Sequence, residues 1–267
     1  MLKIGLLGVG AIGRTIATAV DQKQVLADLV ALADQEPERA ARLSAELRSC
    51  PPVVSIEQML DRSDLVVEAA SQAALAELVP KALACRRDML IMSVGGLLGR
   101  YEWFREADEK GCRIYVPSGA IAGLDGIKSA SIGRIEAAEL TSRKPVEALR
   151  GSQYVVDRGI ELDDLREDTV IFEGSAEEAA RAFPATSNVA ASLRLVVAPS
   201  APVCVRVVAV PRGNENVHEI GVRGEFGRLS MRVENVPSKA NPRTSQLAAF
   251  SAIATLKSLT QSLHIGT

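Results

Sequence analysis

The feature that most constrains the fold of this chain is a glycine-rich turn near its start. Gly8, Gly10 and Gly13 form the pattern G-x-G-x-x-G between an apolar run, Lys3–Leu7, and a helical pattern, Ala11–Val20. Such a turn lets a pyrophosphate approach backbone amides at the N-terminus of a helix. The flanking strand and helix make the pattern specific for dinucleotide binding. The residues predicted to contact the dinucleotide here are Gly8, Gly10, Ala11, Ile12 and Gly13.

A carboxylate at the end of the second apolar run supports the same site. Asp34 lies 21 positions beyond Gly13, close to the spacing of about 20 expected for the residue that binds the adenosine ribose. Its charge would repel a 2′-phosphate, so the predicted cofactor is NAD. Arg39 lies near enough to keep NADP possible. The alternatives are a tight turn without a ligand, and a capping role for Asp34 before the helix that begins at Pro37.

The first half of the chain alternates apolar runs with helical patterns, which is typical of a doubly wound parallel sheet covered by helices. The further predicted strands are Leu29–Ala33, Leu65–Ala69, Met89–Met92 and Arg113–Val116. Ligands of such sheets lie beyond the carboxyl ends of the strands. Ser71 and Ser93 follow two of these ends and are predicted to line the cofactor crevice, although serine is also common in turns for local reasons.

The pattern changes after Pro117. Three strand-like runs, Val203–Val210, Asn216–Val222 and Arg228–Val233, predict a largely antiparallel sheet. The sequence therefore predicts an α/β fold, in which an N-terminal Rossmann domain is joined to a second α+β domain. The expected boundaries are 1–117 for the dinucleotide-binding domain, 118–240 for the catalytic and dimerisation domain, and 241–267 for a C-terminal helix that returns to the first domain.

Charge and hydropathy exclude several classes of partner. The formal net charge is −2 and the pI is near 5.9, so no basic field is available to hold nucleic acid. No apolar run reaches the roughly 18 residues of a membrane helix, and the start of the chain shows no secretory signal. We expect a cytoplasmic protein that acts on a small molecule.

The four cysteines give no sign of a metal centre. Cys50, Cys85, Cys112 and Cys204 are widely scattered, without a C-x-x-C pair or nearby histidines in metal spacing. We therefore expect free thiols, no disulfide and no structural metal.

Segments of the second half together resemble the L-aspartate dehydrogenase family in order and spacing. They are Pro117–Asp125, Asn188–Ala191, Asn216–Ile220, Gly224–Arg228, Glu234–Ser238 and Asn241–Pro242. The resemblance covers nearly the whole chain. It implies a homodimer that oxidises L-aspartate to iminoaspartate, which hydrolyses to oxaloacetate and ammonia. The imine is also a precursor for NAD biosynthesis in the route associated with this family.

The resemblance also implies roles for individual residues. Ala122 and Asn188 match positions that contact the cofactor, and His218 matches the catalytic residue. Asn188 could instead simply cap a helix, because Asn is among the best N-cap residues. One departure occurs at Thr186, where another Asn is expected, and it leaves the shape of the nicotinamide pocket open.

Strand periodicity gives His218 a physical context. With a period of two, His218 shares a face with Ile220 and Val222, while Glu219 points to the other face. An imidazole with its ordinary pKa near 6.5 could exchange a proton at neutral pH. The alternative is a hydrogen-bonded core histidine without a chemical role.

The residues that hold the substrate carboxylates are not identified by the sequence. The candidates are Arg143, Lys144, Lys239 and Arg243. Each is expected to be a solvated surface charge in preference to a ligand, because Lys and Arg are rarely buried.

Two other functions remain open at this point. The first is another two-domain Rossmann oxidoreductase, for example one acting on sugars, although Pro117-Ser118-Gly119 stands where that group carries Glu-Lys-Pro. The second is a non-catalytic NAD-binding sensor, since a fold does not determine a function. The presence of His218 in its motif argues against a sensor.

Overall fold

The computed structural model describes residues 1–184, 187–197, 201–238 and 241–266. The chain forms two compact units. The first unit comprises Met1–Gly119 and Ala248–Ile265, and the second comprises Ala120–Leu247. Each unit has a hydrophobic core of its own.

The first unit is a doubly wound parallel sheet with the strand order β2-β1-β3-β4-β5. Its strands are β1 (Leu2–Leu7), β2 (Ala27–Ala33), β3 (Leu65–Glu68), β4 (Asp88–Ile91) and β5 (Ile114–Tyr115). Its helices are α1 (Ala11–Asp21), α2 (Pro37–Glu46), α3 (Ile56–Arg62), α4 (Gln72–Ala84), η1 (Val94–Leu97), α5 (Tyr101–Lys110) and α11 (Gln246–Thr260). The order reverses between β1 and β3, the point at which such sheets bind ligands.

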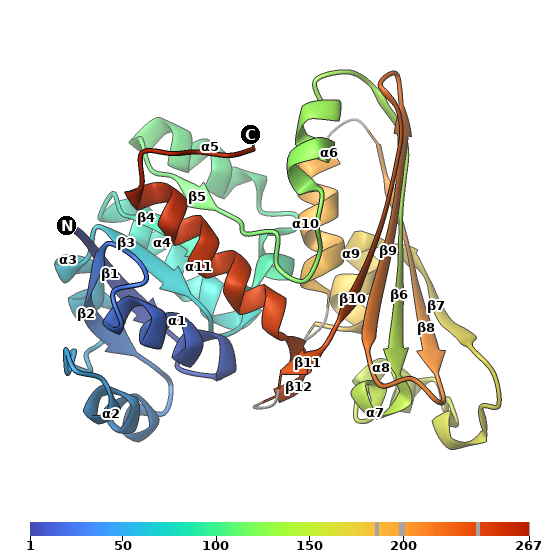
Figure 1. The fold of residues 1–267 in the computed structure, drawn as a ribbon, viewed down its shortest axis with the longest axis horizontal. Helices are drawn as coiled ribbons and strands as arrows, with labels where there is room; N and C mark the ends of the chain where they lie inside the picture. Colours follow the sequence, from blue (N-terminus) through green and yellow to red (C-terminus); the bar gives the residue numbers. More distant parts are fainter. Residues whose placement is uncertain (185–186, 198–200, 239–240, 267) are drawn as a thin grey trace. The chain divides into compact units, whose positions relative to one another are not determined.

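Both faces of this sheet are covered, which explains why its strands are apolar throughout. Ile4 and Leu6 of β1 belong to one core cluster with Ile16 of α1 and Leu256 of α11. The C-terminal helix α11 thus packs in the core of the first unit, as its place beside α1 in Figure 1 illustrates.

The second unit contains a mixed sheet with the strand order β10-β9-β6-β8-β7. Its strands are β6 (Ile135–Pro145), β7 (Thr169–Ser175), β8 (Val203–Val210), β9 (Asn216–Gly224) and β10 (Gly227–Asn235). The pair β6 and β8 is parallel, and the other neighbouring pairs are antiparallel. The helices are α6 (Leu124–Ala130), α7 (Val146–Leu149), α8 (Gln153–Asp157), η2 (Leu162–Asp164), α9 (Ala176–Ala182) and α10 (Asn188–Val197), and a small ribbon pairs β11 (Pro237–Ser238) with β12 (Asn241–Ser245).

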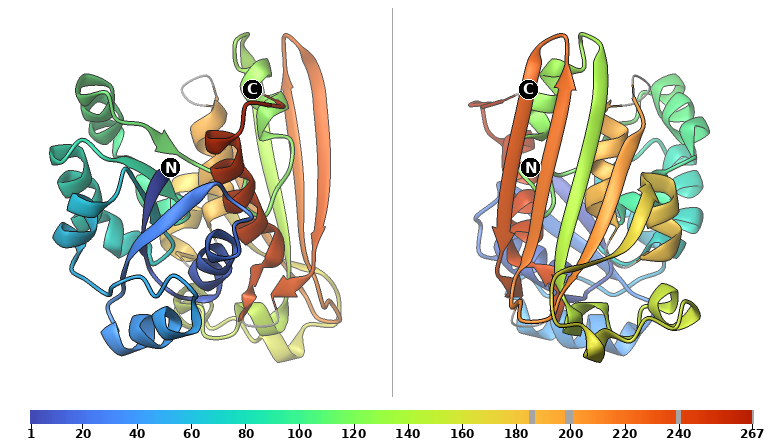
Figure 2. Two further views of the ribbon diagram at one scale, coloured as in Figure 1. Left: turned by 60° about the vertical axis from the view of Figure 1, so that its left-hand side comes forward. Right: turned by 90° about the vertical axis from the view of Figure 1, so that its right-hand side faces the viewer.

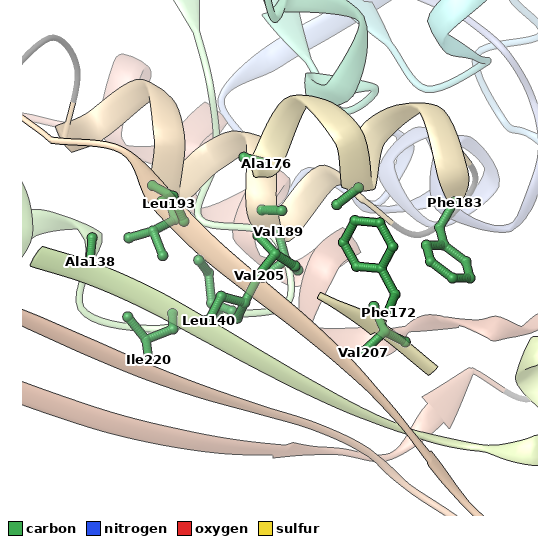
Figure 3. Close-up of a cluster of buried hydrophobic side chains, with 14 of the residues drawn as sticks. Ala138, Leu140, Phe172, Ala176, Phe183, Val189, Leu193, Val205, Val207 and Ile220 are labelled. Carbon is green, nitrogen blue, oxygen red and sulfur yellow. The ribbon is translucent and has the colours of Figure 1, made fainter. Parts of the chain in front are cut away.

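One face of the second sheet is covered by helices α9 and α10 (Figures 1 and 2). Burial alternates along β9, so that His218, Ile220 and Val222 are buried while Glu219 and Gly221 are less so. Leu193 of α10 belongs to the same core, packed against apolar side chains of the strands (Figure 3). The period of two is what places one side of each strand in this core.

The predicted α/β fold with a second α+β domain is confirmed. The structure adds elements that the sequence pattern did not indicate. One is α3, which begins with a capping box between Ser55 and Gln58, and another is the edge strand β7. Strand β6 extends to Pro145 and so brings the polar side chains of its last residues into the sheet.

The four cysteines are free thiols. Within the described ranges, none of the helices is long and apolar enough to cross a membrane. The same residues contain no group of three or more His, Cys, Asp or Glu side chains placed to hold a metal ion.

Candidate active site

The glycine-rich turn joins β1 to α1 by close backbone packing. Gly8 has a φ of +91°, and a Cβ there would lie 2.7 Å from the backbone of Ala69. At Gly13 a Cβ would lie 1.9 Å from the carbonyl oxygen of Gly8. Glycine is therefore required at both positions. Gly10 is the N-cap of α1, and the one atom within 4 Å of a Cβ there is the end of the Arg39 side chain at 3.5 Å, so no backbone blocks a ligand from the first amides of the helix.

A cavity of about 560 Å³ opens beside this turn. It lies at the carboxyl ends of β1, β2 and β3, and its lining includes Gly8, Gly10, Asp34, Arg39 and Ser71. Four of these were predicted to contact the cofactor, and Arg39 was named as the residue that could admit NADP. Ala11, Ile12 and Gly13 belong to the first turn of α1 and are not among the lining residues.

Asp34 is tied to the glycine-rich turn by its carboxylate. One oxygen accepts a hydrogen bond from the backbone N–H of Val9 at 2.8 Å, and the other accepts one from Glu36 at 2.9 Å. The side chain is thereby held at the edge of the cavity, where its remaining lone pairs can accept from ribose hydroxyls. Arg39 lines the same cavity and lies 3.7 Å from Glu36.

The two predicted serines of the crevice have different surroundings. Ser71 lines the cavity and caps α4 by accepting from the N–H of Ala74. Ser93 is buried, and its hydroxyl donates to Glu68 at 2.8 Å. Glu68 also accepts from the backbone of Ala70 and Ser93. Burial raises the pKa of the Glu68 carboxyl. Ser93 is thus fixed to Glu68 and is not among the residues that line the cavity.

The remaining predicted cofactor contacts lie in the second unit. Ala122 is exposed and precedes Gly123, the N-cap of α6. Asn188 is half-buried and begins α10. Thr186, the departure from the family pattern, lies outside the described residues.

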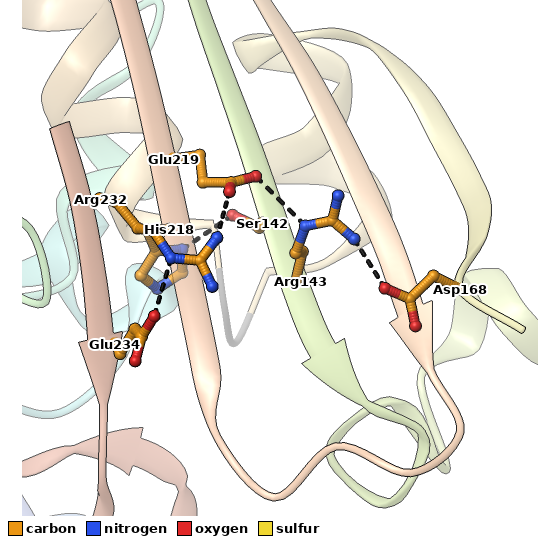
Figure 4. A network of polar contacts seen from close by, with 7 residues as sticks. All are labelled: Ser142, Arg143, Asp168, His218, Glu219, Arg232 and Glu234. Atoms are coloured by element: carbon orange, nitrogen blue, oxygen red, sulfur yellow. Dashed lines mark hydrogen bonds and ion pairs between the residues drawn. The ribbon is translucent and has the colours of Figure 1, made fainter. Parts of the chain in front are cut away.

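His218 is buried on the covered face of the second sheet, with a side chain that is 3% exposed. Its Nδ1 lies 3.0 Å from the hydroxyl of Ser142, the residue opposite it on β6 (Figure 4). Burial, together with the positive charge of Lys144, lowers the pKa of His218 to about 3. The expectation of an ordinary pKa near 6.5 was therefore wrong, because strand periodicity indicates a face but not the degree of desolvation.

Lys144 is a second buried polar residue on this face. Its side chain is 5% exposed, and burial lowers the pKa of its ammonium to about 8. The expectation that Lys144 is a solvated surface charge was wrong. It failed because β6 continues to Pro145, so the alternation that buries Leu140 and Ser142 also buries Lys144.

Arg143 lies on the opposite face of the sheet. Its guanidinium pairs with Glu219 at 3.2 Å and with Asp168 at 2.8 Å, and Arg232 bridges Glu219 to Glu234 (Figure 4). These partners satisfy the charge of Arg143 away from His218. Lys239 and the side chain of Arg243 lie outside the described part of the chain.

The side chains of the covered face form rows across the strands β8, β6, β9 and β10. Two rows are apolar: Val203, Ala138, Val222 and Leu229, then Val205, Leu140, Ile220 and Met231. The next row contains Ser142 beside His218. Beyond it Asn216 pairs with Asn235, and Lys144 lies one position past Arg143, which is the last residue of β6 that pairs with β9. The face therefore changes from hydrophobic core to buried polar groups along the direction of β6.

Asn216 and Asn235 complete the polar end of the face. Asn235 is paired with Asn216 across the two strands, and its side-chain nitrogen donates to the carbonyl of Ala120 at 2.9 Å. Asn216 is 5% exposed, and its Oδ1 has no hydrogen-bond partner among the described residues. The sequence analysis predicted no individual role for Ser142, Asn216 or Asn235. The alternation along the strands could have indicated that Ser142, two residues after Leu140, and Asn216, two residues before His218, lie on the buried face.

Family profiles match both units. The family described as aspartate dehydrogenase, C-terminal, matches residues 125–259, about half of the chain. The family described as homoserine dehydrogenase, NAD binding domain, matches residues 8–117.

Full-length relatives support the same relationship. The L-aspartate dehydrogenases of Methanosarcina barkeri and Methanocella arvoryzae are each 47% identical to this chain, with 100% of both chains covered. That of Bradyrhizobium diazoefficiens is 38% identical over 100% of this chain and 94% of the relative.

Among solved structures, the aspartate dehydrogenase of Thermotoga maritima matches with a TM-score of 0.77 and 24% identity, covering 100% of both chains. A hyperthermophilic archaeal homoserine dehydrogenase in complex with NADPH matches with a TM-score of 0.64 and 11% identity. Identities this low show a shared fold.

Proposed function

This chain belongs to the L-aspartate dehydrogenase family, and we propose on that premise that it catalyses the NAD(P)-dependent oxidative deamination of L-aspartate. The observation within the molecule that best supports this proposal is the polar end of the covered sheet face. There a buried histidine, a buried lysine and a buried asparagine lie on neighbouring strands. Burying polar groups costs stability, and titratable groups with perturbed pKa values cluster at functional sites.

The residues of the first unit fit a bound dinucleotide. Gly10 leaves the N-terminus of α1 open, since the nearest atom to a Cβ there is 3.5 Å away on Arg39. Gly8 and Gly10 would hold the pyrophosphate against the helix amides, and Asp34 would accept from the adenosine ribose. We propose NAD as the preferred cofactor on the charge of Asp34, with Arg39 in the same cavity allowing some use of NADP.

The reaction requires a hydride acceptor and a proton acceptor. NAD(P), held by Gly8, Gly10 and Asp34, would supply the first, because its chemistry when bound is to accept hydride from a substrate carbon. The resulting iminoaspartate is hydrolysed by water to oxaloacetate and ammonia. The chain itself must orient the substrate, exclude bulk water and move protons at the imine.

We assign the proton transfers to His218. Burial keeps its imidazole neutral at pH 7, which is the form that can accept a proton from an attacking water. When Nδ1 carries the hydrogen, it donates to the hydroxyl of Ser142, and Nε2 is left as the base. The imidazolium formed in this step is a strong acid in its buried site, so it readily returns the proton to the departing ammonia.

The experiment that tests this assignment replaces His218 and measures turnover. His218→Ala, provided that it folds and binds NADH, is expected to lose about 100- to 10,000-fold in L-aspartate oxidation, the usual contribution of general acid–base catalysis. His264→Ala is the matched control, because His264 is the other histidine of the chain and is exposed. Near-normal turnover of the His218 variant would remove the residue from the chemistry.

We also propose a cytoplasmic homodimer. The oligomeric state rests on the family resemblance, and light scattering of the purified protein tests it. A reducing compartment agrees with the four free thiols.

A further inference from the structure

Lys144 is a lysine with a side chain that is only 5% exposed and with no ion pair among the residues that the structure describes. Among the described residues no carboxylate or hydrogen-bond acceptor is paired with it, and the nearby group that feels its charge is His218. A buried lysine without a counter-ion costs free energy, and titratable groups that are desolvated in this way cluster at functional sites. This argument predicts that an anion binds beside Lys144.

The amide oxygen of Asn216 is a second unsatisfied group at the same place. The register pairs Arg143 with Val217, so Lys144 and Asn216 occupy the next opposed positions of β6 and β9. Opposed residues have Cβ atoms about 5 Å apart. Among the described residues, a donor and an acceptor that both lack a partner therefore stand at opposed positions of neighbouring strands.

Resting on the proposed function, we propose that Lys144 and Asn216 bind the head of the amino-acid substrate. The ammonium of Lys144 pairs with the α-carboxylate, and Oδ1 of Asn216 accepts a hydrogen bond from the α-amino group. Both substrate groups share the α-carbon, so two residues at adjacent strand positions can reach them together. His218, two residues along β9 on the same face, then lies next to the carbon–nitrogen bond that reacts.

The charge of the bound head also affects His218. In the free protein the positive charge of Lys144 disfavours the imidazolium. A carboxylate paired with Lys144 offsets that charge, so substrate binding raises the proton affinity of His218. His218 therefore becomes a stronger base only when substrate is bound.

The test measures binding calorimetrically to the NADH-saturated protein, with probes that lack one group at a time. L-Aspartate carries both head groups, L-asparagine keeps both but loses the side-chain carboxylate, L-isoasparagine has an amide in place of the α-carboxylate, and succinate has no amino group. The variants are Lys144→Met and Asn216→Leu. Lys128→Met is the matched control, because Lys128 is an exposed lysine of the same unit.

Lys144→Met is expected to weaken the binding of L-aspartate and L-asparagine by about 10- to 150-fold, the value of a hydrogen bond to a charged group. The affinity for L-isoasparagine should not change. Asn216→Leu is expected to weaken the binding of L-aspartate by at least about tenfold, without a comparable effect on the binding of succinate. Lys128→Met should bind every probe as the wild type does.

Two results would overturn the inference. One is a Lys144→Met variant that binds L-aspartate with wild-type affinity. The other is an Asn216→Leu variant in which the binding of succinate is weakened as much as the binding of L-aspartate. Turnover of L-aspartate by the wild type tests the proposed function separately. If the wild type prefers a different L-amino acid, the proposed substrate is wrong, and the same variants are measured with that amino acid because every α-amino acid has this head. A wild type that binds no amino acid refutes both.

Discussion

Replacing Lys144 with methionine is expected to make the protein more stable at neutral pH. Methionine has nearly the length of lysine and no charge, so the substitution keeps the packing and removes a buried ammonium. The pKa of Lys144 falls from the ordinary 10.5 to about 8. At about 1.4 kcal/mol per pKa unit, burying the charged form costs about 3 kcal/mol.

The pH dependence identifies the cause. Because the folded pKa of Lys144 lies below its unfolded value, the unfolded chain binds more protons between pH 8 and 10.5, and wild-type stability rises with pH across that window. The advantage of Lys144→Met is therefore complete below pH 8 and declines as the pH rises toward 10.5. For a chain of this size, about 3 kcal/mol corresponds to an increase in apparent Tm of about 6 to 12 °C.

The assay is chemical and thermal unfolding at pH 7 and pH 9.5, with Lys128→Met as the control that removes an exposed lysine. A Lys144→Met protein that is less stable than the wild type at pH 7, or more stable by the same amount at both pH values, would refute the reasoning. The predicted combination of higher stability and weaker substrate binding is the trade-off expected of a residue retained for function.

Three further predictions concern the cofactor, the substrate and the histidine. Asp34→Ala is expected to lower catalytic efficiency with NAD by about 10- to 150-fold and with NADP by less; unchanged discrimination would contradict the ribose contact. L-Glutamate is expected to be about 10- to 200-fold less efficient than L-aspartate, the range for one methylene, and steady-state kinetics with equal efficiencies would reject the dicarboxylate assignment. His218 has a folded pKa near 3, below its unfolded value of 6.5, so wild-type stability falls as the pH drops below 6.5. Between pH 6.5 and 5 the free energy of unfolding should fall by about 2 kcal/mol because of His218. Urea unfolding of the His218→Gln variant should lack this part of the pH dependence.

Most of the fold could be predicted from the sequence because its elements follow simple periodicities. The turn at Gly8 fixes the first strand and helix, and the alternation in Asn216–Val222 fixes the buried face of β9. Edge strand β7 was missed because only Phe172 among its residues is fully buried, so its hydrophobic alternation is weak. Helix α3 was missed because it is short, although its capping box was legible in the sequence.

The candidate site was predictable only in part. His218 stands in a recognisable motif, but its partners come from β6, whose polar end Ser142-Arg143-Lys144 resembles a strand leaving the sheet. Charged residues at a strand end are usually solvated, and only the pairing of β6 with β8 and β9 shows that Lys144 is enclosed. Long-range pairing of this kind cannot be inferred from local sequence.

The row arrangement of the second sheet has a consequence for how such an enzyme could diversify. On the proposed assignment, the core and the substrate site occupy successive positions of the same strands, so a change of substrate would need substitutions at the polar end and would leave the apolar rows intact. Insertions are different. One extra residue within β9, between His218 and Glu219, would turn every later side chain of the strand to the other face and bring Glu219 to the covered position that Ile220 now occupies. Lineages with this sheet should therefore tolerate exchanges of side chains at its polar end far more readily than changes of strand length.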